Sequence, residues 1–169
     1  MTLSESLLPE FDREMTLTRK CLERVPDDRL EWRPHPKSMA LAHLAGFLGV
    51  LPSWTSVTLA QDSLDLEPPG GQQTPPLPTS THQILDLFDA NVGAARASLQ
   101  QADDGRMMAP WTLLKAGQKI LTMPRVTVLR AFVLNHLIHH RGQLTVYLRL
   151  CDAPVPSVYG PSADEPSWS

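Results

Sequence analysis

The sequence predicts an all-α fold: a four-helix bundle with a small β-hairpin before the last helix. Four segments carry apolar residues at steps of three and four. A connection rich in proline and glycine separates the second segment from the third, and one short segment follows a different pattern. The 169 residues suit a single domain over 1–169. The expected helices span about 4–25, 38–60, 80–102 and 124–150.

The first two helices follow from their caps, prolines and apolar stripes. Ser4 is the expected N-cap of the first helix, and Pro26 ends it. The second helix begins near Ser38, and Pro52 predicts a kink inside it. The first stripe is Leu8, Phe11, Met15, Thr18, Leu22 and Val25; the second is Ala40, His43, Phe47, Val50, Trp54 and Val57.

The connection over residues 62–78 is too rich in proline and glycine to be a helix. It is interpreted as a solvated link between distant helix ends, with a lid over a site as the alternative. The third helix starts near Ser80 and ends at Asp103–Gly105. Its stripe is Leu85, Phe88, Val92, Ala95 and Leu99.

Residues 111–123 hold two short apolar runs on either side of Ala116–Gly117, which predicts a β-hairpin. The fourth helix opens at Pro124, a residue suited to a first turn, and runs to about Leu150. Its stripe is Leu129, Val133, His136, His140, Gln143, Tyr147 and Leu150. The tail after it contains four prolines and is expected to be extended.

Composition excludes several classes of protein. The net charge of −3 argues against a nucleic-acid binder, which normally carries a basic face. Residues 1–10 lack the basic start of a signal peptide, and no run approaches the roughly 18 apolar residues of a membrane span. A soluble cytoplasmic protein is therefore expected. Cys21 and Cys151 are interpreted as free thiols in a reducing compartment, although two cysteines can in principle pair.

The histidines of the second and fourth helices suggest a metal site. Each residue of an α-helix turns about 100°, so His136 and His140 lie on one face. Spacing alone also admits His139, which lies within about 60° of His136. The heptad register favours His136 and His140 as core positions and adds His43 from the second helix. Three imidazoles are the ligand count of a catalytic-type zinc site, which keeps a position open for water or substrate.

The histidines on the apolar stripes can also have a purely structural role. A single histidine on an apolar stripe is more often a hydrogen-bonded core residue than a ligand. Two buried neighbouring imidazoles without a metal, however, each need polar partners, so the three together favour a metal. Gln143 is a hydrogen-bond partner behind one ligand or simply an amide at the core edge. Phe47 and Trp54 either line the cavity or pack in the core.

The pattern disfavours one metalloenzyme class. Zincin peptidases place a glutamate directly after the first helical histidine, whereas here Leu137 follows His136 and no carboxylate lies on the fourth helix. The remaining histidines, His35, His82 and His139, are expected at the surface.

Two segments carry a family resemblance. Leu30–Gly49 (LEWRPHPKSMALAHLAGFLG) and Asn135–Leu150 (NHLIHHRGQLTVYLRL) resemble the DinB/YfiT-like superfamily, most specifically in HHRGQL, and the hairpin region and Val155–Glu165 are also similar. The resemblance implies a bundle with up-down-down-up connectivity, a metal held by His43, His136 and His140, and commonly a homodimer. Some members act as metal-dependent thiol transferases or related isomerases, and many have no established activity.

The leading hypothesis is a transferase in which one divalent metal ion, zinc or nickel, activates a low-molecular-weight thiol toward an electrophilic small molecule. No general base can be named from the sequence. The alternatives are metal-assisted hydrolysis and a non-catalytic bundle that binds metal or dimerises. The sequence predicts neither a nucleic-acid nor a membrane partner.

Overall fold

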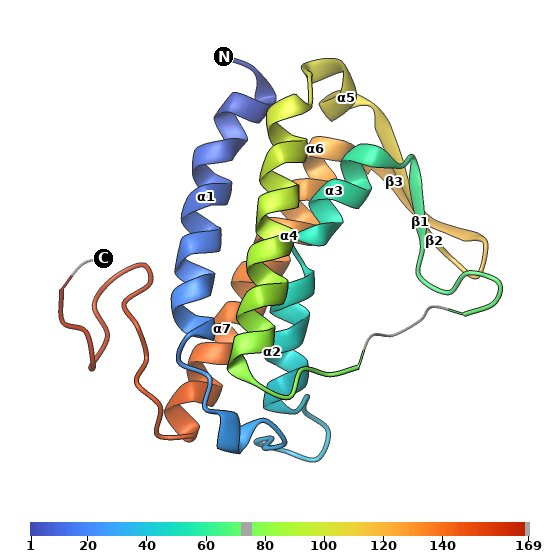
Figure 1. The fold of residues 1–169 in the computed structure, drawn as a ribbon. Coiled ribbons are helices and arrows are strands. Elements are labelled where there is room, and N and C mark those ends of the chain that lie inside the picture. The colour runs from blue at the N-terminus through green and yellow to red at the C-terminus, as the bar shows by residue number, and fades with distance from the viewer. Residues whose placement is uncertain (72–75, 168–169) are drawn as a thin grey trace.

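The computed structural model describes residues 1–71 and 76–167 and is mostly helical, with a small three-stranded sheet. The helices lie side by side around one hydrophobic core, and the sheet projects from one side of them (Figure 1). In chain order the elements are α1 (Leu3–Leu22), η1 (Asp27–Arg29), α2 (Leu41–Val50), α3 (Ser53–Ala60), β1 (Ser63–Asp65), α4 (Thr81–Gln101), α5 (Asp104–Met108), β2 (Pro110–Lys115), β3 (Gln118–Pro124), α6 (Arg125–Val128), η2 (Leu129–Leu134) and α7 (Asn135–Leu150).

Helices α1 and α4 pack against each other, and both follow their predicted stripes closely. The predicted cap of α4 is confirmed, since the Ser80 side chain accepts a hydrogen bond from the Gln83 backbone. The predicted cap of α1 is wrong. Thr2 caps that helix in a capping box with Glu5, which satisfies two free backbone N–H groups at once. Ser4 lies inside the helix and donates to the Ala102 carbonyl.

The break at Pro52 is confirmed, because it separates α2 from α3. The helical part begins at Leu41, later than the predicted start near Ser38. The predicted core stripe of this segment is wrong at His43, which is exposed; Ala40 is buried, and Phe47, Val50, Trp54 and Val57 are half-buried. Helix α2 is apolar on nearly every side, so its periodicity does not single out one face. The residues that face the core are instead Leu41, Ala42, Leu44, Ala45, Leu48 and Leu51.

The predicted hairpin is confirmed as β2 and β3, which pair in antiparallel fashion. Its turn residues Ala116 and Gly117 both have positive φ, 50° and 74°, as a two-residue turn requires. The connection before α4 contains β1, which pairs in parallel with β2. The Asp65 carboxylate at the end of β1 accepts from the backbone N–H groups of Ala116 and Gly117. Part of the proposed lid, residues 72–75, lies outside the described residues.

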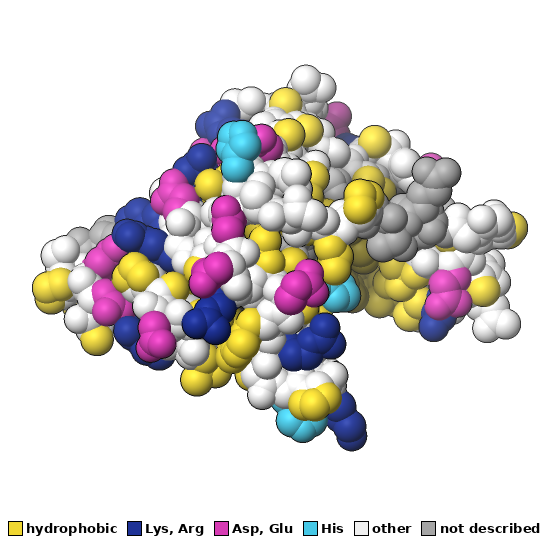
Figure 2. All heavy atoms as spheres, turned by 60° about the horizontal axis from the view of Figure 1, so that its bottom comes forward, with side chains coloured by type: hydrophobic (Ala, Val, Ile, Leu, Met, Phe, Trp, Pro, Cys, Tyr) yellow, Lys and Arg dark blue, Asp and Glu magenta, His cyan; other side chains and the backbone are white. Residues whose placement is uncertain are grey.

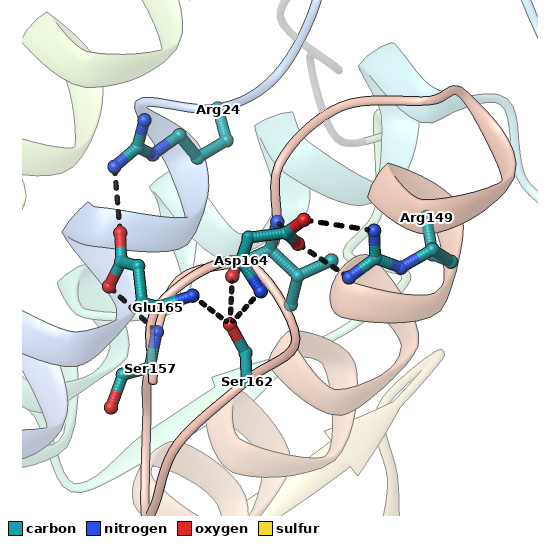
Figure 3. A network of polar contacts seen from close by, with 7 residues as sticks. Arg24, Arg149, Ser157, Ser162, Asp164 and Glu165 are labelled. Carbon is teal, nitrogen blue, oxygen red and sulfur yellow. Dashed lines mark hydrogen bonds and ion pairs between the residues drawn. The ribbon is translucent and has the colours of Figure 1, made fainter. Parts of the chain in front are cut away.

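The described part of the C-terminal tail, residues 151–167, has no helix or strand and runs back along α1 and α7 (Figures 1 and 3). Asp164 pairs with Arg149 of α7, and Glu165 pairs with Arg24 just after α1. The Ser162 hydroxyl accepts from the backbone N–H groups of both acidic residues. Figure 3 shows how these contacts join the tail to both helices. The tail therefore closes the end of the core where α1 and α7 meet.

Candidate functional site

The structure brings His136 and His140 together on α7. Their Nε2 atoms lie 2.9 Å apart, and their ring centroids lie 4.7 Å apart. Phe47 of α2 packs edge-on against both rings, at centroid distances of 5.3 and 5.0 Å. His140 is buried and His136 half-buried. The Nε2 atoms of the two imidazoles thus point toward each other at the edge of the core.

A wide turn in the last helix decides which way this pair points. Over Leu129–Leu134 the helix is π-helical, with one more residue in each hydrogen-bonded ring than an α-helix has. The most deeply buried residues of α7 are therefore Leu137, Arg141, Leu144 and Leu148, each one residue later than the predicted His136, His140, Gln143 and Tyr147, and His140 is buried at their edge with 9% exposure. One extra residue rotates the rest of the helix by about 100°, which moves the imidazoles from the core to its edge.

The second nitrogen of each imidazole also has a partner. His140 Nδ1 lies 2.7 Å from Gln143 Oε1, and the ring of His136 is hydrogen-bonded to the backbone of Phe132 within the wide turn. Burial lowers the pKa of both imidazoles, and the nearby His140 lowers that of His136 further. Both hydrogen bonds oppose this lowering. The neutral imidazole, which is the form that ligates a metal, is favoured at neutral pH.

The third predicted ligand, His43, lies on α2 one turn before Phe47, so both occupy the same face of that helix. Its side chain is exposed, contrary to the core position that the register predicted. In residues 1–71 and 76–167, no group of three or more His, Cys, Asp or Glu side chains is arranged to hold a metal ion. The structure thus assembles two of the predicted ligands and leaves the third on a neighbouring surface.

Phe47 and Trp54 are half-buried and packed against the main core, so both take part in core packing. Figure 2 shows a histidine at the edge of a hollow walled by hydrophobic side chains. On the same face, basic side chains are interspersed with acidic ones. Two cavities lie away from the imidazoles: one between α1 and α4 beside Met15 and Phe88, the other at the hairpin tip beside Ile120.

The other histidines lie at the surface, as predicted. His82 is exposed beside Asp86, and His35 is exposed in its loop. His139 is exposed while its ring packs against that of His140. Cys21 and Cys151 are free thiols, as predicted, and burial raises the pKa of Cys21 to about 11, so that thiol is protonated at neutral pH.

The sequence reasoning missed Arg141, which directly follows His140. Arg141 is 1% exposed, and its guanidinium lies between α1 and the C-terminal tail. Nη2 donates to Glu14 Oε2 and to the Tyr159 hydroxyl, both at 2.7 Å. Tyr159 also donates to Glu14 Oε2, at 2.7 Å. The sequence does show a basic residue directly after the histidines. Its partners, Glu14 and Tyr159, are 127 and 18 residues away along the chain, so only the fold brings them together.

Comparison with known proteins identifies the family. The family model described as the DinB family matches residues 1–167. The chain belongs to the DinB family. A curated DinB relative, the uncharacterized protein YrdA of Bacillus subtilis (strain 168), is 27% identical over 166 residues, or 95% of this chain and 90% of YrdA.

Two solved DinB-like proteins share the fold. The DinB-like protein from Bacillus cereus ATCC 10987 superposes with a TM-score of 0.68 at 25% identity, covering 92% of this chain and 97% of that one. The DinB-like protein YjoA from Bacillus subtilis gives 0.66 at 16% identity, covering 89% and 95%. In the described parts of this DinB-family chain, no helix is long and apolar enough to cross a membrane.

The metal-free protein is expected to lose stability because of the histidine pair over a pH window that begins near the unfolded pKa of about 6.5 and extends to lower pH. Unfolded imidazoles titrate near pH 6.5, whereas folding lowers the pKa of His136 and His140. The unfolded chain therefore binds more protons in this window. The stabilisation is complete above the unfolded pKa and falls as the pH drops toward the folded values. Urea midpoints, measured with a chelator present, are expected to fall less for a His136→Gln/His140→Gln variant than for the wild type.

The exposed His139 offers a graded comparison for this titration, because its charge also lowers the pKa of His136 and of His140. His139→Gln is therefore expected to reduce the pH dependence less than the double variant does. The carboxyl groups whose pKa folding lowers, Asp27, Asp65 and Asp164, titrate at lower pH and do not interfere. Equal losses of stability in the wild type and the double variant would show that the pair does not titrate as described.

Proposed function

We propose that this DinB-family protein binds one divalent metal ion, zinc or nickel, through His43, His136 and His140. The observation that carries the proposal is the 2.9 Å approach of two imidazole Nε2 atoms. Two nitrogen lone pairs at that distance repel each other unless a proton or a metal ion lies between them. Imidazole nitrogen is a preferred ligand for both metals, and the lowered pKa of each ring favours its ligating form.

Two of the three proposed ligands, His136 and His140, lie together, with their Nε2 atoms 2.9 Å apart. His43 completes the set in this proposal, because it shares a face of α2 with Phe47, whose ring lies against both imidazoles. Three neutral ligands would leave the charge of the ion uncompensated and a coordination position open. The up-down-down-up connectivity implied by the family resemblance would bring these ligands together. We also propose, from the same resemblance, that the protein forms a homodimer.

We further propose that the site joins a low-molecular-weight thiol to an electrophilic small molecule. When bound, a divalent ion strongly lowers the pKa of a coordinated thiol, so the thiolate nucleophile forms at neutral pH. The chain itself would orient the substrates in the apolar surroundings of Phe47 and Trp54 and limit the access of water. Residues 125–150 contain no carboxylate that could serve as a general base for water, which favours this reaction over hydrolysis.

Metal content tests the site directly. Untagged wild-type protein and the variants His140→Ala, His43→Ala and His139→Ala would be purified without chelators, resupplied with zinc or nickel, and measured by inductively coupled plasma mass spectrometry. About one ion per chain is expected in the wild type and in His139→Ala, with a loss of at least about tenfold in affinity for the other two. His139→Ala is the matched control because it removes the adjacent imidazole.

Wild-type protein that holds no stoichiometric metal after resupply would refute the site and the transferase together. Metal binding that is unaffected by His43→Ala would remove His43 from the ligand set. The loaded protein would then be assayed with a thiol and an electrophile. Stoichiometric metal without any turnover would leave a non-catalytic metal-binding bundle.

A further inference from the structure

Gln143 lies one turn after His140 on α7 and is half-buried. Its Oε1 atom is 2.7 Å from His140 Nδ1, the ring nitrogen that faces away from His136. A side-chain carbonyl oxygen can only accept a hydrogen bond, so Nδ1 must donate. A neutral imidazole carries one ring proton, and the other nitrogen, Nε2, is then an unprotonated acceptor.

We propose that Gln143 is a positioning residue that holds His140 as its Nδ1–H tautomer and so aims the Nε2 lone pair at the ion site. The inference rests on the proposed metal site for its purpose, and on the contact between Gln143 and His140 for its geometry. It also explains why an amide follows the histidines within the HHRGQL segment. The spacing of three residues places the amide over the same face of the helix as the imidazole.

The alternative tautomer shows what Gln143 prevents. Without an acceptor at Nδ1, His140 can carry its proton on Nε2 and donate it across the 2.9 Å gap to His136 Nε2. That closed pair would use both nitrogens that a metal needs, so binding an ion would first require its hydrogen bond to break. A neutral amide holds the His140 proton on Nδ1 without adding a negative charge beside the proposed ion site.

The tautomer can be read in the metal-free protein by ¹⁵N nuclear magnetic resonance of the imidazole nitrogens at a pH where the rings are neutral. His140 is expected to show a protonated Nδ1 in the wild type and in Gln143→Glu, which keeps an acceptor. In Gln143→Met, which has similar size and no acceptor, the proton is expected on Nε2. Gln100→Met, an exposed position on α4, is the control for a glutamine-to-methionine change on a helix.

Metal affinity gives the second readout. Loss of a partner behind a ligating histidine typically costs about 10–100-fold in affinity, so Gln143→Met is expected to bind zinc that much more weakly while Gln143→Glu stays near the wild type. A wild-type tautomer and affinity in Gln143→Met would overturn the inference, as would a protonated Nε2 in the wild type. If the wild type binds no zinc, the proposed site fails, while the resonance experiment still decides the role of Gln143.

Discussion

Replacing Arg141 by methionine is expected to lower the free energy of unfolding by about 3–5 kcal/mol, because the Glu14 carboxylate would lose its cationic partner inside the protein. Both side chains are almost fully buried, and Arg141 Nη2 lies 2.7 Å from Glu14 Oε2. The guanidinium also donates to the Glu14 carbonyl, the Thr18 hydroxyl and the Tyr159 hydroxyl. Urea denaturation followed by circular dichroism would measure the loss.

A second ion pair between helices supplies the control for Arg141. Arg96 of α4 pairs with Asp12 of α1 in two hydrogen bonds, but both side chains are more than 40% exposed. Arg96→Met is therefore expected to cost less than about 1 kcal/mol. A Glu14→Leu/Arg141→Met variant removes the stranded charge and is expected to recover part of the loss. Equal effects of Arg141→Met and Arg96→Met would show that burial does not govern the Glu14–Arg141 pair.

Replacing Arg125 by methionine is expected to cost about 3–4 kcal/mol, because it strands backbone carbonyls inside the protein. Arg125 is 1% exposed and donates to the carbonyls of Thr58 and Gln61 at the end of α3 and to that of Pro110 at the start of β2. A cation at the carboxyl end of a helix also interacts favourably with the helix dipole. The side chain thus ties α3 to the sheet.

The effect of Arg125→Met should be local as well as global. Hydrogen exchange measured by mass spectrometry is expected to increase at the end of α3 and in the hairpin before it increases in α1. Asp62 accepts from the same guanidinium but is 85% exposed, so Asp62→Asn should cost under about 1 kcal/mol. Uniform loss of protection across the chain, or a large effect of Asp62→Asn, would contradict this assignment.

Features that depend on a few neighbouring residues could be predicted from the sequence. The positive φ values at Ala116 and Gly117 make a two-residue turn, the Ser80 cap starts α4, and Pro52 separates α2 from α3. Each follows from backbone sterics or from hydrogen bonds within four residues. The spacing of His136 and His140 belongs to the same class, because an α-helix places positions four apart on one face.

Strand β1 and the π-helical turn depend on contacts between distant residues, and neither was predicted. Three residues within a connection form a strand only when β2 lies beside them. Leu129–Leu134 contains no proline or glycine that would mark an irregular helix. The turn lets Arg125 bind the end of α3 while Arg141 reaches Glu14.

The sequence by itself thus determined the helices, the hairpin, the adjacent histidine pair and the family resemblance, since these rest on short-range patterns. The tertiary structure decided the direction in which those patterns face. Helix α2 is apolar on nearly all sides, so only its packing against α4 and α7 could place the face that carries His43 and Phe47 at the edge of the core, with His43 exposed and the Phe47 ring against the imidazoles. Likewise, one extra residue in the last helix placed His140 at the edge of the core and Arg141 inside it.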